Sequence, residues 1–132
     1  MLKPETTQIL PTKILSRKDE ITADFIALAE NHITSLMSGT DTKRLSASDF
    51  GKLLFINPRH LTTTLKLTMD SSVCDYMENR FTEEAQKLLT ETDLSIAEIG
   101  LRFAYSEATN FTKFFKGMTG VTPLQYRKSH KM

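Results

Sequence analysis

Apolar residues recur every three or four positions over residues 21–36, which predicts a helix with one buried face. Ser16 or Asp19 precedes this stretch and can cap the N-terminus of the helix. The turn-forming sequence Ser-Gly-Thr-Asp at residues 38–41 predicts where the helix ends. The apolar positions of this predicted helix are Ile21, Phe25, Leu28, Ile33 and Leu36.

Residues 1–20 predict a linker or N-terminal arm rather than part of a folded core. Polar residues dominate this segment, and Pro4 and Pro11 interrupt it. Within it, residues 9–15 predict a short strand.

A longer helix is predicted over residues 73–92, where apolar side chains again follow three-and-four spacing through roughly five turns. The sequence Thr-Asp-Leu-Ser at residues 92–95 breaks this helix and supplies a cap for the next one. A helix of this length can bridge two small subdomains. Its apolar positions are Val73, Tyr76, Met77, Phe81, Ala85, Leu88 and Leu89.

The chain also repeats itself on either side of this long helix. The sequence LTTTLK at residues 61–66 aligns with FTKFFK at residues 111–116, an offset of 50 positions. The preceding segments align at an offset of 49, which pairs Ser46 with Ser95 and Gly51 with Gly100. The second unit therefore has one extra residue, in its turn or at the start of its second helix.

The second of these units, at residues 95–127, predicts a helix-turn-helix. A short helix, a tight turn and a second helix are followed by Gly-Val-Thr-Pro at residues 120–123 and by a basic tail. That order is typical of the motif that places one helix in a DNA groove.

These residues also resemble the second helix-turn-helix of the AraC/XylS family of bacterial transcription regulators. In that family the segment typically runs S-I-x-E-I-A, G-F, F-x-x-x-F-K and then G-x-T-P-x-x-Y-R. The resemblance extends over residues 21–128 and is weaker in the first unit. The matching residues are Ser95, Ile96, Glu98, Ile99, Phe111, Phe115, Lys116, Gly120, Thr122, Pro123, Tyr126 and Arg127.

The resemblance implies an all-α fold of about seven helices, with two helix-turn-helix subdomains joined by the long helix. It implies a DNA-binding domain at residues 21–132. Within that domain, the first helix-turn-helix lies at about residues 46–67, the linking helix at 73–92 and the second helix-turn-helix at about 95–118. The implied function is sequence-specific DNA binding that regulates transcription, with double-stranded DNA contacted in two adjacent major grooves.

Family members commonly carry a separate effector-binding or dimerisation domain as well. The chain of 132 residues is expected to hold only the DNA-binding domain. It is then either the fragment of a longer effector-responsive regulator, which we favour, or a stand-alone regulator. The segment itself is expected to be monomeric. Dimerisation through a missing domain and contact with RNA polymerase are further expectations.

Small residues and turn residues support the two helix-turn-helix units. Gly51 and Gly100 occupy equivalent places in the first helices and predict close packing against the second helices. Phe55 and Ala104 stand where the family often has a turn glycine, which is a departure from its pattern. Two polar residues, Asn57 and Ser106, are predicted as N-caps of the second helices, the first of which begins with Pro58.

The second helices, at residues 58–67 and 107–118, each have an apolar face that is predicted to be core and an opposite face that is free to meet DNA. N-terminal residues of a recognition helix reach base edges, where Arg and Lys donate to guanine and Thr bonds bases or touches thymine methyls. Any surface helix also has a solvated face, and on composition alone that alternative is favoured. With the resemblance we favour DNA contact, above all for Arg59 and Lys113. The candidate DNA-binding residues are Arg59, Thr62, Thr63, Lys66, Glu107, Thr109, Thr112, Lys113 and Lys116.

Three of the charged residues keep two interpretations. Glu107 can accept a hydrogen bond from cytosine N4 or stabilise the helix N-terminus. Lys116 and Arg127 can contact phosphate, as Lys128 can, or they can be structural, with stems that pack to hold the final helix at residues 123–128. Both alternatives stay open at this point.

The net charge of the chain says little about DNA binding, but the distribution of charge along the chain does. The whole chain has a net charge of +1. Residues 106–128 contain four cationic residues against the single acid Glu107, a local charge of +3, so the rest of the chain has a net charge of −2. The basic character is thus concentrated around the second recognition helix. The near-neutral total leaves a rival hypothesis, a helical protein-interaction domain that has lost DNA binding.

No residue pattern predicts a cofactor, a metal site or an enzyme. The three histidines lie far apart in sequence, and the single cysteine, Cys74, is predicted to be a small buried apolar residue. Some DNA-repair methyltransferases carry a similar DNA-binding unit, but one cysteine cannot supply both their zinc site and their acceptor. With no signal peptide or membrane segment predicted, we expect a cytoplasmic protein with no membrane partner.

Overall fold

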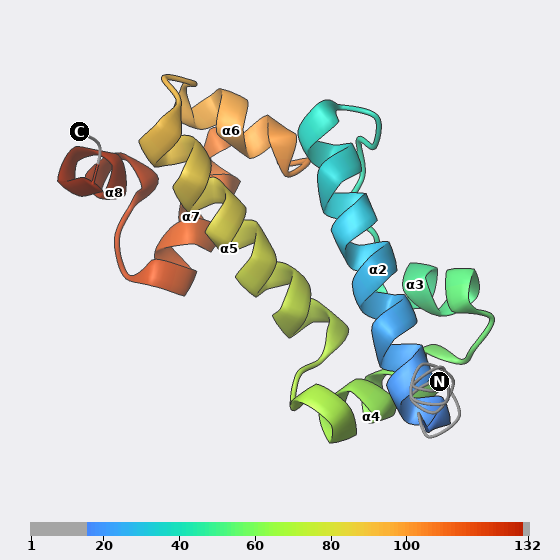
Figure 1. Cartoon of the computed structure of the whole chain (residues 1–132). Helices are drawn as coiled ribbons and strands as arrows, with labels where there is room; N and C mark the ends of the chain where they lie inside the picture. Colours follow the sequence, from blue (N-terminus) through green and yellow to red (C-terminus); the bar gives the residue numbers. More distant parts are fainter. Residues whose placement is uncertain (1–15, 131–132) are drawn as a thin grey trace, which may run out of the picture.

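Seven helices and no strand make up residues 16–130, the part of the chain that the computed structural model describes (Figure 1). The all-α architecture with two helix-turn-helix units and a linking helix is therefore confirmed. The strand predicted at residues 9–15 lies outside the described residues. The helices are α2 (Arg17–Ser38), α3 (Ala47–Leu54), α4 (Pro58–Met69), α5 (Val73–Glu91), α6 (Ile96–Arg102), α7 (Ala108–Thr119) and α8 (Pro123–His130).

Helix α2 begins after Ser16, the earlier of the two predicted N-caps. Ser16 is its N-cap, and the Ser16 hydroxyl accepts a hydrogen bond of 3.1 Å from the backbone N–H of Asp19. Residues 17–20, which were assigned to the linker, are therefore helical. The helix ends at Gly39, whose φ of +82° is a left-handed conformation that glycine adopts without a steric cost.

The first unit consists of α3 and α4 packed against α2. Phe25 of α2 meets Phe50 of α3 edge to face, with ring centroids 5.2 Å apart. Leu61 and Leu65 of α4 are fully buried in the same core, as predicted. In the second unit, Phe111 and Phe115 of α7 are also fully buried, and α8 closes this unit.

Figure 1 shows α5 crossing the molecule between the two units, from the end of α4 to the group formed by α6, α7 and α8. The side of α5 that carries the predicted apolar residues is buried, including Val73, Phe81 and Leu89. The helix ends at Glu91, with Thr92 as its C-cap. The prediction for Cys74 was wrong, because its side chain is exposed on the first turn of α5.

The two units share the same local construction. Capping boxes open α3 at Ser46 and Asp49, and α6 at Ser95 and Glu98. In both turns a backbone N–H donates 2.9 Å back to the small residue of the first helix: Ile56 to Gly51, and Tyr105 to Gly100.

The glycines allow the close approach of the two helices that the repeat predicts. A Cβ on Gly51 would lie 2.9 Å from the carbonyl oxygen of Ile56, and one on Gly100 would lie 3.0 Å from the Cβ of Phe111. A side chain at Gly51 would clash with backbone, whereas one at Gly100 would require Phe111 to move by a few tenths of an ångström.

The extra residue of the second unit lies in its turn. Ile56 and Tyr105 are equivalent at an offset of 49, whereas the N-caps Asn57 and Glu107 are equivalent at an offset of 50, so the addition is Ser106. The Asn57 side chain accepts 2.8 Å from the N–H of Arg59, which confirms that cap. Ser106 is not the cap of α7; Glu107 holds that position, without a side-chain cap bond.

Candidate nucleic-acid interface

Helices α4 and α7 are amphipathic in the sense that DNA recognition requires. On α4 the buried residues Leu61, Thr64 and Leu65 define one side. At 100° per residue, Arg59, Thr63 and Lys66 lie on the opposite side, and all three are exposed.

The same arrangement recurs on α7, 50 positions later. Phe111 and Phe115 are buried, and the exposed residues Thr109, Lys113 and Lys116 lie opposite them. Position by position, these three correspond to Arg59, Thr63 and Lys66 of α4. We call the two sets the α4 stripe and the α7 stripe.

The remaining sequence-predicted residues lie at the edges of these stripes. Thr62 and Thr112 occupy equivalent positions and are partly buried, so each presents only part of its side chain. Glu107 is exposed at the N-cap of α7, where its carboxylate lies at the positive end of the helix dipole.

The two stripes differ in the charges around them. Lys66 has an ion pair of 4.0 Å with Asp75 of α5, and both side chains are more than half exposed, so the pair is weak. Helix α7 contains no acidic residue, and no ion pair to Lys113 or Lys116 occurs within residues 16–130. The α7 stripe therefore keeps its positive charge available.

One exposed polar residue on α7 was missed by the sequence interpretation. Asn110 lies in the first turn of the helix, about 60° around the axis from Lys113 towards the side of Ser106. An asparagine at such a position can bond the N6 and N7 edge of adenine. The signal was present in the sequence, because Asn110 is not part of the apolar face.

Arg127 is structural. Its guanidinium donates 3.0 Å to the carbonyl oxygen of Leu89 and 3.2 Å to that of Thr92, at the C-terminal end of α5. These bonds hold α8 against α5 and orient the guanidinium towards the end of that helix. Lys128 on α8 remains exposed.

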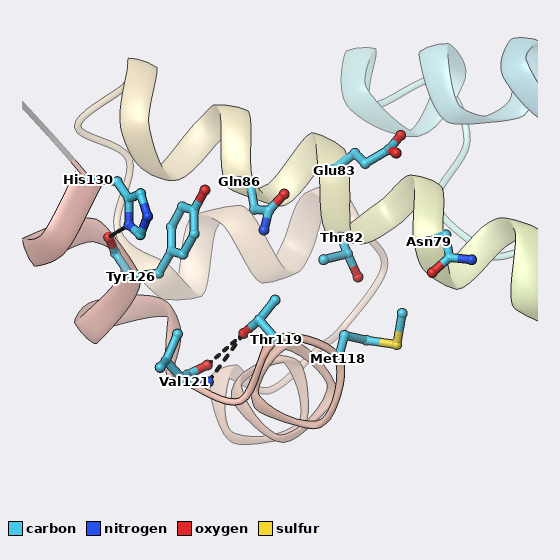
Figure 2. A pocket seen from close by; sticks show the side chains of 9 residues that line it. All are labelled: Asn79, Thr82, Glu83, Gln86, Met118, Thr119, Val121, Tyr126 and His130. Atoms are coloured by element: carbon cyan, nitrogen blue, oxygen red, sulfur yellow. Dashed lines mark hydrogen bonds between the residues drawn. The ribbon is translucent and has the colours of Figure 1, made fainter.

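A hollow of about 630 Å³ lies between α5 and the α7–α8 corner and is a separate feature. Figure 2 shows Asn79, Glu83 and Gln86 along one wall, with Tyr126 on the α8 side. Thr119 joins α7 to the loop by bonding both the N–H and the carbonyl of Val121 (Figure 2). The lining contains no lysine or arginine, so this hollow is not a phosphate-binding surface.

Residues 51–129 match a family profile described as a helix-turn-helix domain. The chain belongs to the AraC/XylS family. The match covers more than half of the chain and includes both recognition helices and all but the last residue of α8. The chain is thus a DNA-binding domain of the kind found in transcription regulators. The alternative of a protein-interaction domain without DNA binding gains no support from these comparisons.

Curated relatives of the AraC/XylS domain agree with this assignment. The transcriptional regulator YtdP of Bacillus subtilis is 26% identical over 130 residues, which is 98% of this chain but 16% of that protein. The transcriptional activator AarP of Providencia stuartii is 29% identical over 93 residues, 70% of this chain and 69% of AarP. The bifunctional activator and DNA repair enzyme AdaA of B. subtilis is 26% identical, and 47% of its length is matched. The chain thus spans less than half the length of YtdP and AdaA.

Solved structures share the fold over most of the chain. The C-terminal domain of AraT, a response regulator from Geobacillus stearothermophilus, has a TM-score of 0.77 and 26% identity, and the match covers 89% of this chain and 91% of that domain. The DNA-binding domain of AdpA, solved with a target DNA, has a TM-score of 0.68 at 18% identity, covering 81% of this chain and 89% of that one. The AdpA comparison concerns the fold alone.

Two findings bear on other possible sites. Within residues 16–130, no three His, Cys, Asp or Glu side chains are grouped so that they could hold a metal ion. None of the helices in that range is both long and apolar enough to cross a membrane.

Proposed function

We propose that this chain is the DNA-binding part of a larger transcription regulator and that it reads a specific operator with α4 and α7 in two adjacent major grooves. The observation that carries the proposal is the equivalence of the two stripes, which are exposed at the same three positions of both recognition helices. Both stripes consist of cationic and threonine side chains without an acidic residue, which is the chemistry that contact with bases and phosphates requires.

Each stripe has the chemistry of base and phosphate recognition. Arg59 and Lys113 are the candidates for guanine O6 and N7, while Thr63, Thr109, Thr62 and Thr112 supply hydroxyl and methyl contacts. Lys66 and Lys116, one to two turns further along, are suited to phosphates. Asn110 adds a candidate for adenine. These assignments follow from helix position and side-chain chemistry.

The proposed domain extends from α2 to α8, with its boundary before Arg17 rather than at residue 20, because the Ser16 cap begins a helix that packs into the core. Its role is binding and not catalysis, and it acts as a monomer unless a further domain of a longer protein dimerises it. RNA polymerase is a candidate partner of such a regulator. Since the proposed partner is operator DNA, we infer a cytoplasmic location.

Selection of bound sequences from a random duplex pool tests this proposal directly. We expect two short boxes whose centres are about 10 base pairs apart, one turn of the duplex. Binding to the selected duplex is then measured between low and moderate salt. If five or six phosphates are neutralised, log K falls against log[salt] with a slope of about −5. A pool that yields no enriched sequence, or a slope near zero, contradicts the proposal.

A further inference from the structure

A partly buried ion pair joins α2 to α5. Its two residues, Glu30 and Arg80, are 50 positions apart in sequence. Arg80 of α5 donates to both carboxylate oxygens of Glu30, through Nε at 2.7 Å and a terminal nitrogen at 2.8 Å. The Tyr76 hydroxyl donates 2.8 Å to the same carboxylate. The Arg80 side chain is 22% exposed and that of Glu30 is 39% exposed.

Two further arginines form hydrogen bonds between the two units. Arg102 of α6 donates 3.0 Å to the carbonyl oxygen of Met37, seven residues along α2 from Glu30 and thus on the same face of that helix. In the opposite direction, Arg44 donates 2.7 Å to the carbonyl oxygen of Phe103. The Arg44 guanidinium also lies 4.1 Å from the ring centroid of Tyr105, in the turn before α7.

These contacts are directional, unlike the apolar core of each unit. A guanidinium that forms two bonds to one carboxylate fixes both the distance and the orientation of the helices that carry the two groups. The pKa of Glu30 is lowered, chiefly by the hydrogen bonds from Arg80, so the carboxylate remains ionised at neutral pH. Burial and the bond to Glu30 raise the pKa of Tyr76 to about 12, so its hydroxyl remains a donor.

We propose that Glu30 and Arg80, together with Arg44 and Arg102, are positioning residues that set the separation and relative orientation of α4 and α7, and thereby the spacing between the two DNA boxes. The inference rests on the proposed function for its consequence on DNA, but its structural part does not. None of the four residues belongs to either stripe.

The structural part is tested without DNA. Spin labels are attached at Leu53→Cys on α3 and Leu101→Cys on α6, both exposed positions outside the stripes, in a chain carrying Cys74→Ser. The label–label distance distribution is compared between the parent, Arg80→Leu and Glu30→Gln. We expect the distribution to broaden or shift in both variants. A distribution that is unchanged in both, with thermal melts confirming that the proteins are folded, overturns the proposal.

Lys87→Leu is the matched control for this experiment. It removes the other cation of α5, which lies near the same carboxylates: Lys87 pairs at 3.3 Å with Glu84, an acceptor that it shares with Arg80, and it contributes to the lowered pKa of Glu30. Its loss leaves both hydrogen bonds between Glu30 and Arg80 in place. We expect its distance distribution to equal that of the parent. If Lys87→Leu broadens the distribution as much as Arg80→Leu does, the effect is one of charge and the positioning role is wrong.

The consequence for DNA is tested with the duplex selected from the random pool, lengthened or shortened between its boxes by 2 base pairs. Two base pairs rotate one box by about 70° and move it by about 7 Å. We expect the parent to lose about tenfold in affinity on these duplexes, and Arg80→Leu to lose less than about threefold. On a duplex with a single box, the affinities of the parent and of Arg80→Leu should agree within about twofold.

A role limited to stability gives a different pattern. It would lower binding to every duplex by the same factor, leave the dependence on spacing unchanged and so overturn the proposal. Failure of the parent to bind any selected duplex defeats the proposed function, while the label distances still decide whether the arginine contacts hold the units in place.

Discussion

Three residues connect α3 to α4 in the first helix-turn-helix, whereas five connect α6 to α7 in the second. One of the two additional residues is the inserted Ser106, and the other is present because α6 is one residue shorter than α3. The shorter turn is closed by Phe55 at φ +60°, a residue that is 94% exposed, and the longer one passes through Ala104 at φ +66°. The α4 stripe has one arginine and a lysine that is paired with Asp75, while the α7 stripe has two lysines that form no ion pair within residues 16–130.

The comparison indicates that the two units share one backbone arrangement but contribute differently to DNA binding. Both units need the glycine in the first helix, the capping box and a left-handed residue in the turn. The recognition stripes are free to diverge because no packing depends on them. We therefore expect the second unit to contribute more to discrimination and to phosphate binding than the first.

The largest expected effect is the loss of stability when a core side chain of either unit is truncated. Phe111→Ala should destabilise the domain by about 3–5 kcal/mol, because the fully buried ring packs against Phe103, Tyr105 and Phe115. Leu61→Ala, at the equivalent position of α4, should cost about 2–5 kcal/mol. Chemical denaturation measures both. Phe114→Ala is the control: its ring is only partly buried, and a loss as large as that of Phe111→Ala would contradict the assignment of Phe111 to the core.

Joint engagement of the two units has the next largest effect. Inserting 5 base pairs between the selected boxes turns one box to the opposite face of the duplex. Affinity should fall by about 2–4 kcal/mol, the value of two base contacts from the α4 stripe. A duplex with the first box scrambled should bind equally weakly in a titration. If the insertion leaves affinity unchanged, only one unit reads DNA.

The two stripes themselves are compared at one equivalent position. Lys113→Ala should leave the free energy of unfolding nearly unchanged, because the side chain is exposed, and should weaken DNA binding by about 1–3 kcal/mol. Thr63→Ala, its counterpart on α4, should weaken binding by less. Titration of both variants on the same duplex checks the order. Equal losses, or a larger loss for Thr63→Ala, would reverse the weighting of the two units.

The local parts of this structure follow from the sequence, and the long-range parts do not. Periodic apolar positions predict the helices and the burial of Leu61, Leu65, Phe111 and Phe115, because a helix face is a local property. The cap of α7 was misassigned, since Ser106 is the extra turn residue and the one-residue shift leaves Glu107 at the N-cap. The exposure of Cys74 depends on how α5 lies against the other helices, which spacing along one helix does not contain.

The candidate site divides in the same way. The stripes could be predicted because they are the faces opposite two apolar rows. That Arg127 binds the end of α5, and that Arg80 binds Glu30, could not be predicted, since each contact joins residues 35 to 50 positions apart. A sequence pattern shows that an arginine is present but not which distant carbonyl or carboxylate it reaches.

A smaller effect is expected from the left-handed turn residues. A non-glycine residue in this conformation is strained, and Phe55 has little packing to lose because its ring is exposed. Phe55→Gly should stabilise the domain by about 0.5–1 kcal/mol, the relief of strain less the entropy that glycine adds to the unfolded chain. Denaturation midpoints measure this. Phe55→Ala is the control: it removes the ring but keeps a Cβ, so an equal gain would contradict strain as the cause.

The smallest effect concerns the two capping boxes, where the units are most alike. Hydrogen bonds from the backbone N–H and hydroxyl of Ser46 and Ser95 lower the pKa of Asp49 and Glu98 respectively. A carboxylate whose pKa is lower in the folded state stabilises the fold above its unfolded pKa, here near 3.8 and 4.5. That contribution is lost as the pH falls through the folded values.

Unfolding measured from pH 7 to pH 2 should therefore show a steeper loss of stability for the parent than for Glu98→Gln, which keeps a side-chain acceptor but does not titrate. Asp49→Asn should flatten the same curve to a similar degree, because both carboxylates are exposed and bonded in the same way. Parallel curves for the parent and both variants would show that the caps act through their neutral hydrogen bonds alone. A change in only one variant would mark the capping boxes as a further difference between the two units.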